Sequence, residues 1–108
     1  MSSANTPYVV SLAGSLTTPR AQATHATIVA ALSDHDCVAI DCAGASEMDV
    51  SFVQLLVAAH RYALRRGKTV ALASPPSGLV AETLLRCGFA PPKRPSAALD
   101  EVLSLPSM

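Results

Sequence analysis

The sequence has few aromatic residues and no excess of charge of either sign. It contains no tryptophan, and its aromatic residues are two tyrosines and two phenylalanines. Its eight basic side chains balance its eight acidic side chains. Because a balanced chain lacks the basic patch by which proteins attract nucleic acid, we expect no nucleic-acid partner. The shortage of aromatic rings predicts a core built mainly from aliphatic side chains.

Long apolar runs are also missing. No run approaches the ~20 residues that a membrane-spanning helix needs, and the N-terminal segment lacks the basic and apolar regions of a secretory signal. We therefore expect a cytoplasmic protein without direct membrane insertion. The length of 108 residues fits one core, so residues 1–108 are predicted to form a single domain.

Paired metal-ligand motifs are absent as well. The three cysteines, Cys37, Cys42 and Cys87, form no C-x-x-C pair, and the three histidines show no H-x-x-x-H spacing. None of the thiols falls at a predicted helix N-terminus, where the pKa of a cysteine is lowered. We expect reduced thiols that pack as small apolar side chains, no metal or other cofactor, and no enzymatic activity.

The apolar residues that are present alternate between two kinds of pattern. Short continuous runs, typical of buried strands, lie at residues 8–12, 37–42 and 69–73. Longer segments with helical spacing lie at residues 18–32, 50–66 and 78–87. Strands that alternate with helices predict an α/β domain whose sheet is largely parallel.

The two ends of the chain carry weaker patterns. Residues 1–7 are small and polar, and we expect them to be disordered. Residues 90–95 are predicted to form a proline-rich loop within the domain. A short C-terminal helix should follow, with Leu99, Val102 and Leu103 facing inward.

Turn and cap signals join these elements. Residues 13–15 are predicted to form a turn, and Thr18 with the following proline reads as the start of the first helix. Residues 43–48 are predicted to be the turn before the helix at 50–66. Asp49 is a good N-cap for that helix.

Two carboxylates fall near the C-terminal edge of the predicted sheet, where α/β proteins place ligand sites. They belong to Asp41 and Asp49. Such a pair can bind a cation or transfer protons, but a structural interpretation is simpler. We expect Asp41 to accept hydrogen bonds from the turn and Asp49 to cap the helix.

Apolar side chains cover more of the helix at 50–66 than one contact with a sheet requires. One stripe is predicted to face the sheet: Phe52, Leu55, Leu56, Ala59 and Ala63. A second stripe is also mostly apolar: Val50, Val53, Val57, His60 and Leu64. Either a neighbouring helix covers the second stripe, or the stripe is exposed and forms a partner or dimer surface. The sequence leaves both interpretations open.

Several short motifs follow one another in a distinctive order. They lie at residues 38–42 (VAIDC), 48–51 (MDVS), 54–56 (QLL), 66–68 (RGK) and 84–89 (LLRCGF), after an LAGSL segment at 12–16. This order resembles the STAS domain family, which includes bacterial anti-sigma-factor antagonists. The resemblance implies an α/β domain with about four strands in a mixed or mostly parallel sheet and with helices packed mainly on one face.

The chain departs from this family at the position that controls its switching members. In those members the residue after the turn aspartate is the serine or threonine that a partner kinase phosphorylates. Here that residue is Val50, which has no hydroxyl, and Phe52 replaces a family glycine. Ser51 is the nearest alternative phosphorylation site, although a phosphate there would be repelled by Asp49.

The resemblance therefore implies a non-catalytic protein–protein interaction module of bacterial signalling, not regulated at the usual phosphosite. One alternative is a small STAS subunit of an ABC phospholipid-transport complex, and another is a phosphoswitch through Ser51. The implied partners are an anti-sigma factor or related kinase, a chemotaxis or two-component protein, or a transporter ATPase, with a homodimer as a further alternative. The expected docking residues are Asp49, Val50, Ser51, Val53, Gln54, Val57 and Arg61.

Overall fold

The computed structural model describes residues 7–89 and 98–103. Of residues 1–7, which were predicted to be disordered, only the exposed Pro7 falls within this range. The loop predicted at residues 90–95 lies outside it. The elements are, in order, β1 (Tyr8–Leu16), the short 3-10 helix η1 (Thr18–Arg20), α1 (Ala21–Asp34), β2 (Cys37–Met48), α2 (Val50–Arg65), β3 (Thr69–Leu72), α3 (Gly78–Arg86) and α4 (Leu99–Val102).

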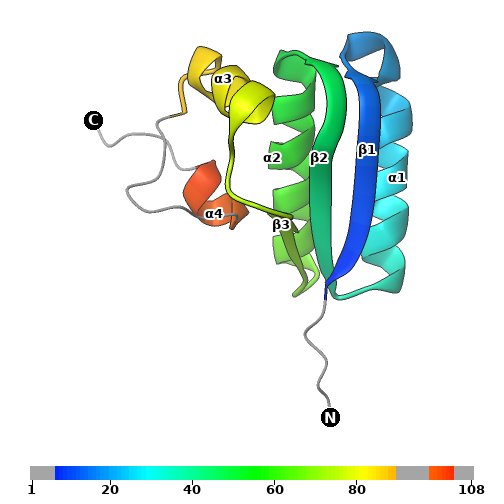
Figure 1. Cartoon of the computed structure of the whole chain (residues 1–108). Coiled ribbons are helices and arrows are strands. Elements are labelled where there is room, and N and C mark those ends of the chain that lie inside the picture. Colours follow the sequence, from blue (N-terminus) through cyan, green and yellow to red (C-terminus); the bar gives the residue numbers. More distant parts are fainter. Residues whose placement is uncertain (1–6, 90–97, 104–108) are drawn as a thin grey trace.

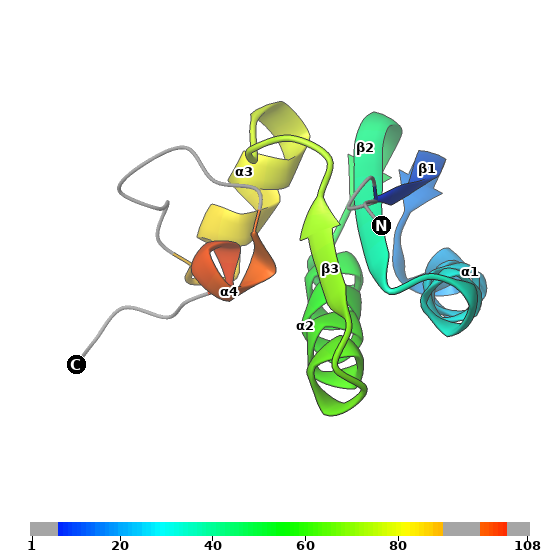
Figure 2. The ribbon, with the colours of Figure 1, turned by 90° about the horizontal axis from the view of Figure 1, so that it is seen from below.

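The described part of the chain forms a three-stranded sheet in the order β1-β2-β3, and both neighbouring pairs are parallel (Figure 1). Helices α1 and α2 lie on one face of this sheet, whereas α3 and α4 lie beside β3 (Figure 2). The predicted α/β class and the placement of helices on one face are therefore confirmed. The strand count is lower than expected, and the described residues add only an isolated antiparallel bridge between Ala71 and Ala98.

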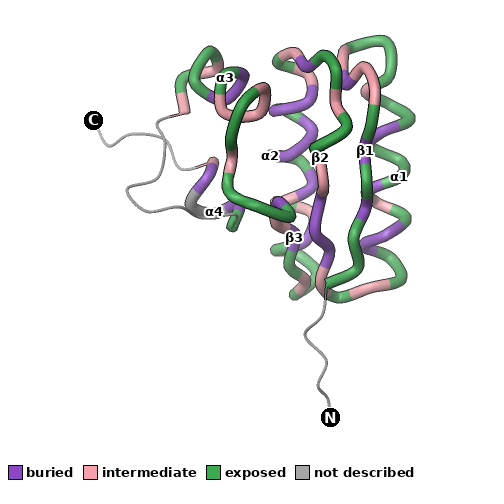
Figure 3. Tube along the Cα trace, in the orientation of Figure 1, coloured by how far each residue is buried: buried purple, intermediate pink, exposed green. Residues whose placement is uncertain are grey.

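The core lies between the sheet and its helices and is mainly aliphatic, as predicted. Its largest buried side chains include Ile28, Leu32, Ile40, Phe52 and Leu56, none of which is more than 1% exposed. Buried positions recur along α2 and in the first part of β2 (Figure 3). The whole predicted sheet-facing stripe of α2 is buried. Because burying one large aliphatic side chain stabilises a fold by about 1.5–3 kcal/mol, α2 is held firmly along its length.

Strand β2 continues further than the sequence indicated. Residues 43–48, expected as a turn, are part of the strand, and Leu16 pairs with Met48. The prediction was wrong because pairing with β1 holds these small and polar residues extended, and two register shifts absorb the additional residues of β2. Gly44 permits the close approach, since a Cβ at this position would lie 3.1 Å from the Cβ of Ala13.

Strand β1 also continues further, and the first helix begins later than predicted. Residues 13–15, expected as a turn, belong to β1, where Gly14 has a φ of 79°, a value that favours glycine. Thr18 begins η1, and α1 starts only at Ala21. The reason is a tertiary contact, because the N–H and the hydroxyl of Thr18 both donate to Asp49.

The ends predicted for α2 and α3 are confirmed. Gly67 and Gly88 follow the two helices with φ values of 68° and 94°, in the left-handed region that favours glycine at a helix end. After α3, the N–H of Phe89 donates to the carbonyl oxygen of Leu84 at 3.0 Å. Phe89 also packs against the core, so both helices end in locally determined caps.

Candidate functional site

The start of α2 is organised around the carboxylate of Asp49, which is the N-cap residue as predicted. Its Oδ1 accepts hydrogen bonds from the N–H of Ser51, at 2.9 Å, and from the Ser51 hydroxyl. Its Oδ2 accepts from the N–H and the hydroxyl of Thr18, at 3.1 and 3.2 Å. This one carboxylate therefore joins the first turn of α2 to the segment that leads into α1.

These hydrogen bonds stabilise the ionised form of Asp49. The Ser51 hydroxyl is the largest of the causes that lower the pKa of the Asp49 carboxyl, and the remaining donors on Thr18 and Ser51 act in the same direction. Partial desolvation opposes them. At neutral pH the carboxylate is therefore charged and held in one orientation.

Several of the predicted docking residues lie on an accessible side of α2. Val50 is 53% exposed although it is apolar. Gln54 and Arg61 are exposed, and Val57 is partly exposed. The four residues are spaced four, three and four positions apart, so they follow one side of the helix. We call Val50, Gln54, Val57 and Arg61 the α2 strip; Asp49 and the half-buried Ser51 lie at its beginning.

Val53 does not belong to this surface, contrary to the prediction. Its side chain is only 3% exposed, and it is part of the core that also contains Leu84 of α3 and Leu99 of α4. Helix α2 contacts both of these helices, and His60, from the same stripe as Val53, shares a groove with Leu99. Neighbouring helices therefore cover part of the second stripe, while Val50 at its beginning stays accessible.

Two exposed leucines were not identified as site residues from the sequence. Leu64 of α2 is 64% exposed and Leu85 of α3 is 57% exposed. Leu64 and His60 line a groove of about 190 Å³ together with residues of β3 and α4. Helical spacing placed Leu64 on the second stripe, but only the position of α4 decides which members of that stripe remain open.

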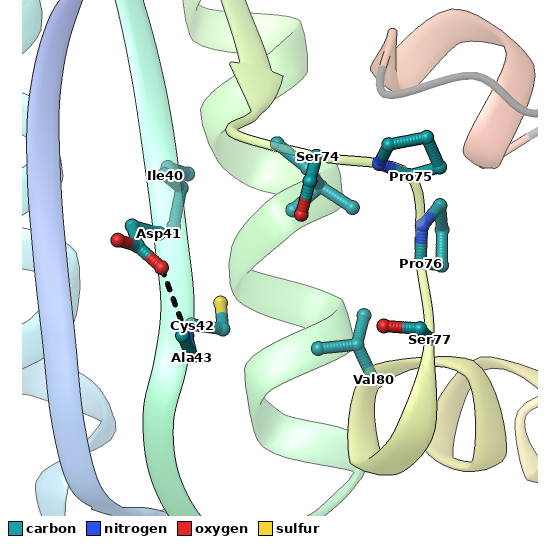
Figure 4. Close-up of a pocket in the computed structure, with 10 residues that line it drawn as sticks. Ile40, Asp41, Cys42, Ala43, Ser74, Pro75, Pro76, Ser77 and Val80 are labelled. Atoms are coloured by element: carbon teal, nitrogen blue, oxygen red, sulfur yellow. Dashed lines mark hydrogen bonds between the residues drawn. The ribbon is translucent and has the colours of Figure 1, made fainter.

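A second open region is a cleft of about 120 Å³ between the middle of β2 and the C-terminal end of β3, beside the start of α3 (Figure 4). Asp41 and Cys42 line it from β2, and residues 74–77 line it from the other side. Oδ1 of Asp41 accepts from the N–H of Ala43 at 2.9 Å, which is the backbone role expected for this carboxylate. Ser77, at the start of α3, makes no side-chain cap hydrogen bond.

The Cys42 thiol in the cleft is not an activated nucleophile. Burial, assisted by the charge of Asp41, raises the pKa of the Cys42 thiol to about 11, so the thiol is protonated at neutral pH. All three cysteines are free. Within residues 7–89 and 98–103, no group of three or more histidine, cysteine, aspartate or glutamate side chains is placed to hold a metal ion.

No described helix is both long enough and apolar enough to span a bilayer. A comparison with protein families gives a match to the family model described as "Mlab, STAS domain", over residues 2–91. No curated protein and no solved structure matches the chain. The matched range contains Asp49, the α2 strip and the cleft, so both candidate regions lie within the part of the chain that the family model describes.

Proposed function

The chain belongs to the STAS domain family, and from that premise we propose that it is a non-catalytic protein–protein interaction module of bacterial signalling. STAS domains generally mediate protein interactions and are generally non-catalytic. We place the docking surface on the α2 strip, with Asp49 and Ser51 at its beginning. The observation that carries this proposal is the exposure of Val50 beside the Asp49 carboxylate.

Val50 presents an exposed apolar side chain on the hydrogen-bonded first turn of α2. It is 53% exposed, and it directly follows Asp49, whose carboxylate accepts hydrogen bonds from Thr18 and Ser51. A β-branched side chain on an ordered backbone loses little conformational freedom when a partner covers it. The polar side chains of Gln54 and Arg61 supply the rim that usually surrounds the apolar centre of an interface.

The same geometry argues against a phosphoswitch. Val50 occupies the usual position and has no hydroxyl, and the Ser51 hydroxyl already donates to Asp49. A phosphate on Ser51 would replace that donor by a group of like charge to the carboxylate. We therefore propose that docking is constitutive and that Ser51 acts as a donor within the helix start.

The partner belongs to one of two classes. The first, which we favour, is a signalling protein: an anti-sigma factor or related kinase, or a chemotaxis or two-component protein. The second is the ATPase of an ABC transporter, for which the chain would be a small STAS subunit. Co-purification of the chain from its native host, with each recovered protein then expressed and tested individually, separates the two classes.

The α2 strip is tested by Val50→Asp. An added carboxylate at the first turn of a helix is compatible with the helix dipole, so the fold should persist while the apolar contact is lost. Binding of the identified partner, measured by titration calorimetry, should weaken by about 1–2 kcal/mol, or roughly 5- to 30-fold.

Leu85→Asp is the matched control, because Leu85 is 57% exposed on α3, outside the α2 strip. It should leave the affinity for the same partner unchanged. The proposal fails if Val50→Asp retains the wild-type affinity, or if Leu85→Asp and Val50→Asp weaken binding equally.

A further inference from the structure

We propose that the outer edge of β1, together with the side of α1 below it, forms a second docking site that accepts one extended peptide strand from another protein. The strand would carry a basic residue at the end that lies beside Asp34. This site is separate from the α2 strip, so it goes beyond the proposed function and does not depend on it.

The outer edge of β1 is open in the described structure. Within residues 7–89 and 98–103, β1 pairs only with β2. Its nine residues include no charged residue and no proline, which are the usual means of blocking a sheet edge. Tyr8 and Val9 are 48% and 51% exposed. An edge of this kind presents unpaired backbone groups to any extended chain that approaches it.

The register identifies which backbone groups face outward. The N–H of Ala73 donates to the carbonyl oxygen of Ile40, so Ile40 and Val38 direct their backbone groups toward β3. Because alternate residues of a parallel strand face opposite neighbours, Ala39 faces β1, where its register partner is Val9. In this pattern Val10 bonds to β2, and Val9 and Ser11 direct their N–H and carbonyl groups to the free edge.

The helix layer is wider than the sheet that it covers. A helix with its side chains is about 10 Å wide and neighbouring strands are about 4.8 Å apart, so two helices cover about four strands. Here α1 and α2 lie under three strands. On the far side, β3 is bridged at Ala71 by Ala98. The uncovered strip of the helix layer therefore lies beside β1, above α1.

An open groove of about 510 Å³ occupies this strip. Its walls are the first residues of β1 and the facing side of α1, where Thr27, Ala30 and Ala31 contribute small side chains. Thr27 and Ala30 are exposed. Small side chains leave room for the residues of an added strand that point toward the helix layer.

A second copy of this chain does not fit the groove. Pairing of two β1 edges would place the two strands about 4.8 Å apart, and the α1 helices beneath them at a comparable distance. Packed helices need about 8–10 Å between their axes. The occupant must therefore be a strand without a helix of its own beside it, such as a linear segment of a partner protein.

The charge of the groove favours a basic residue at one end of that segment. Asp34, at the end of α1, lines the groove and is exposed, and it takes part in neither of the salt bridges found between described residues. The facing strand β1 carries no charge that could compensate it. A lysine or arginine beside Asp34 would supply the missing partner, whereas an acidic residue would be repelled.

The test selects a phage-displayed library of peptides of about 12 residues, long enough to pair along β1, against the intact chain. Enriched peptides should alternate apolar β-branched or aromatic residues and carry a lysine or arginine near one end. Their affinities are then measured as synthetic peptides by fluorescence anisotropy.

Thr27→Phe fills the groove and should weaken binding by about tenfold or more. Ser33→Phe is its matched control, because each hydroxyl donates to the carbonyl four residues earlier, at 3.0 and 3.1 Å, and both residues are exposed on α1. Ser33 does not line the groove, so this control should leave the affinity unchanged.

The backbone contact is tested separately. Ser11→Pro removes an outward N–H and should weaken binding, whereas Ser11→Ala retains it and should not. Asp34→Lys should weaken the binding of peptides that carry the basic residue, because the two like charges repel each other. Circular dichroism and thermal unfolding establish that each variant is folded.

Three results would overturn the proposal. The first is that no peptide is enriched, or that enriched peptides bind Thr27→Phe as well as the wild type. The second is a dimer, seen by light scattering, that Thr27→Phe abolishes. The third is a tenfold or greater gain in affinity on deletion of residues 2–6, which would make the chain's own N-terminal segment the occupant. Because Val50→Asp leaves this groove intact, failure here and failure of the α2 strip are distinguishable.

Discussion

The starts of α2 and α3 meet the same requirement in different ways. Each helix begins with backbone N–H groups that have no partner within the helix. At α2, Asp49 accepts from the N–H of Ser51 and also binds Thr18. At α3, the Ser77 side chain makes no cap hydrogen bond and lies at an open cleft. The difference teaches that an N-cap can support a docking surface when a tertiary contact holds it as well.

The two helices also differ in how many residues they bury. Helix α2 buries six residues, whereas α3 buries only Thr83 and Leu84. A partner that docks on α2 therefore meets a helix that the core holds along its length, while α3 is held mainly on one side near its end. Four experiments, from the largest to the smallest expected effect, test how the two helix starts and their surroundings differ.

The largest effect is expected from Phe52→Ala. Phe52 is 1% exposed within the core, and truncation of such a ring costs about 3–5 kcal/mol. Urea unfolding measures the change in the free energy of unfolding. The α3 counterpart is Leu85→Ala, at a residue 57% exposed, which should change stability by no more than about 0.5 kcal/mol. Equal losses would contradict the contrast between the helices.

The next effect compares the two N-caps. Asp49→Ala removes the acceptor of the hydrogen bonds from Thr18 and Ser51, so the thermal midpoint should fall by several degrees. Ser77→Ala should change it little, because the Ser77 side chain makes no cap hydrogen bond. Differential scanning calorimetry of the two variants measures both changes. A larger fall for Ser77→Ala would reverse the comparison.

A pH titration sharpens the role of the Asp49 carboxylate. Its pKa is lowered in the folded chain, chiefly by the Ser51 hydroxyl. The stabilisation from this group is therefore fully present above the unfolded pKa of about 3.9 and is lost as the pH falls through the lower folded pKa. The stability advantage of the wild type over Asp49→Asn should shrink on acidification. An advantage that stays constant down to the acid transition would count against this explanation.

The smallest effect concerns the cleft beside α3. Because burial raises the pKa of Cys42 to about 11, little thiolate exists at neutral pH. In a chain with Cys37→Ser and Cys87→Ser, alkylation of Cys42 by iodoacetamide should accelerate with each rise in pH without reaching a plateau below about pH 10. A rate that is half-maximal near pH 9 would show an ordinary thiol and a more reactive cleft.

The sequence alone determined the features that depend on neighbouring residues. The alternation of strands and helices, the Asp49 cap, and the glycines that end α2 and α3 were all predicted, because hydrogen-bond capping and left-handed backbone are local properties. The sheet-facing stripe of α2 was predicted for the same reason, since helical spacing places Phe52 and Leu56 on one face. The resemblance to the STAS family rested on these same local motifs, and the family match over residues 2–91 confirms it.

Only the tertiary structure decided the features that depend on distant segments. Residues 43–48, expected as a turn, form strand because they pair with β1. Thr18 lies in η1 and does not cap α1, because its N–H and hydroxyl donate to Asp49. The packing of α3 and α4 buried Val53 and left Val50 accessible. The free edge of β1 likewise exists because the described sheet ends there. The physical reason is common to all four: pairing and burial are set by which segments meet in space, and helical or strand periodicity does not encode those meetings.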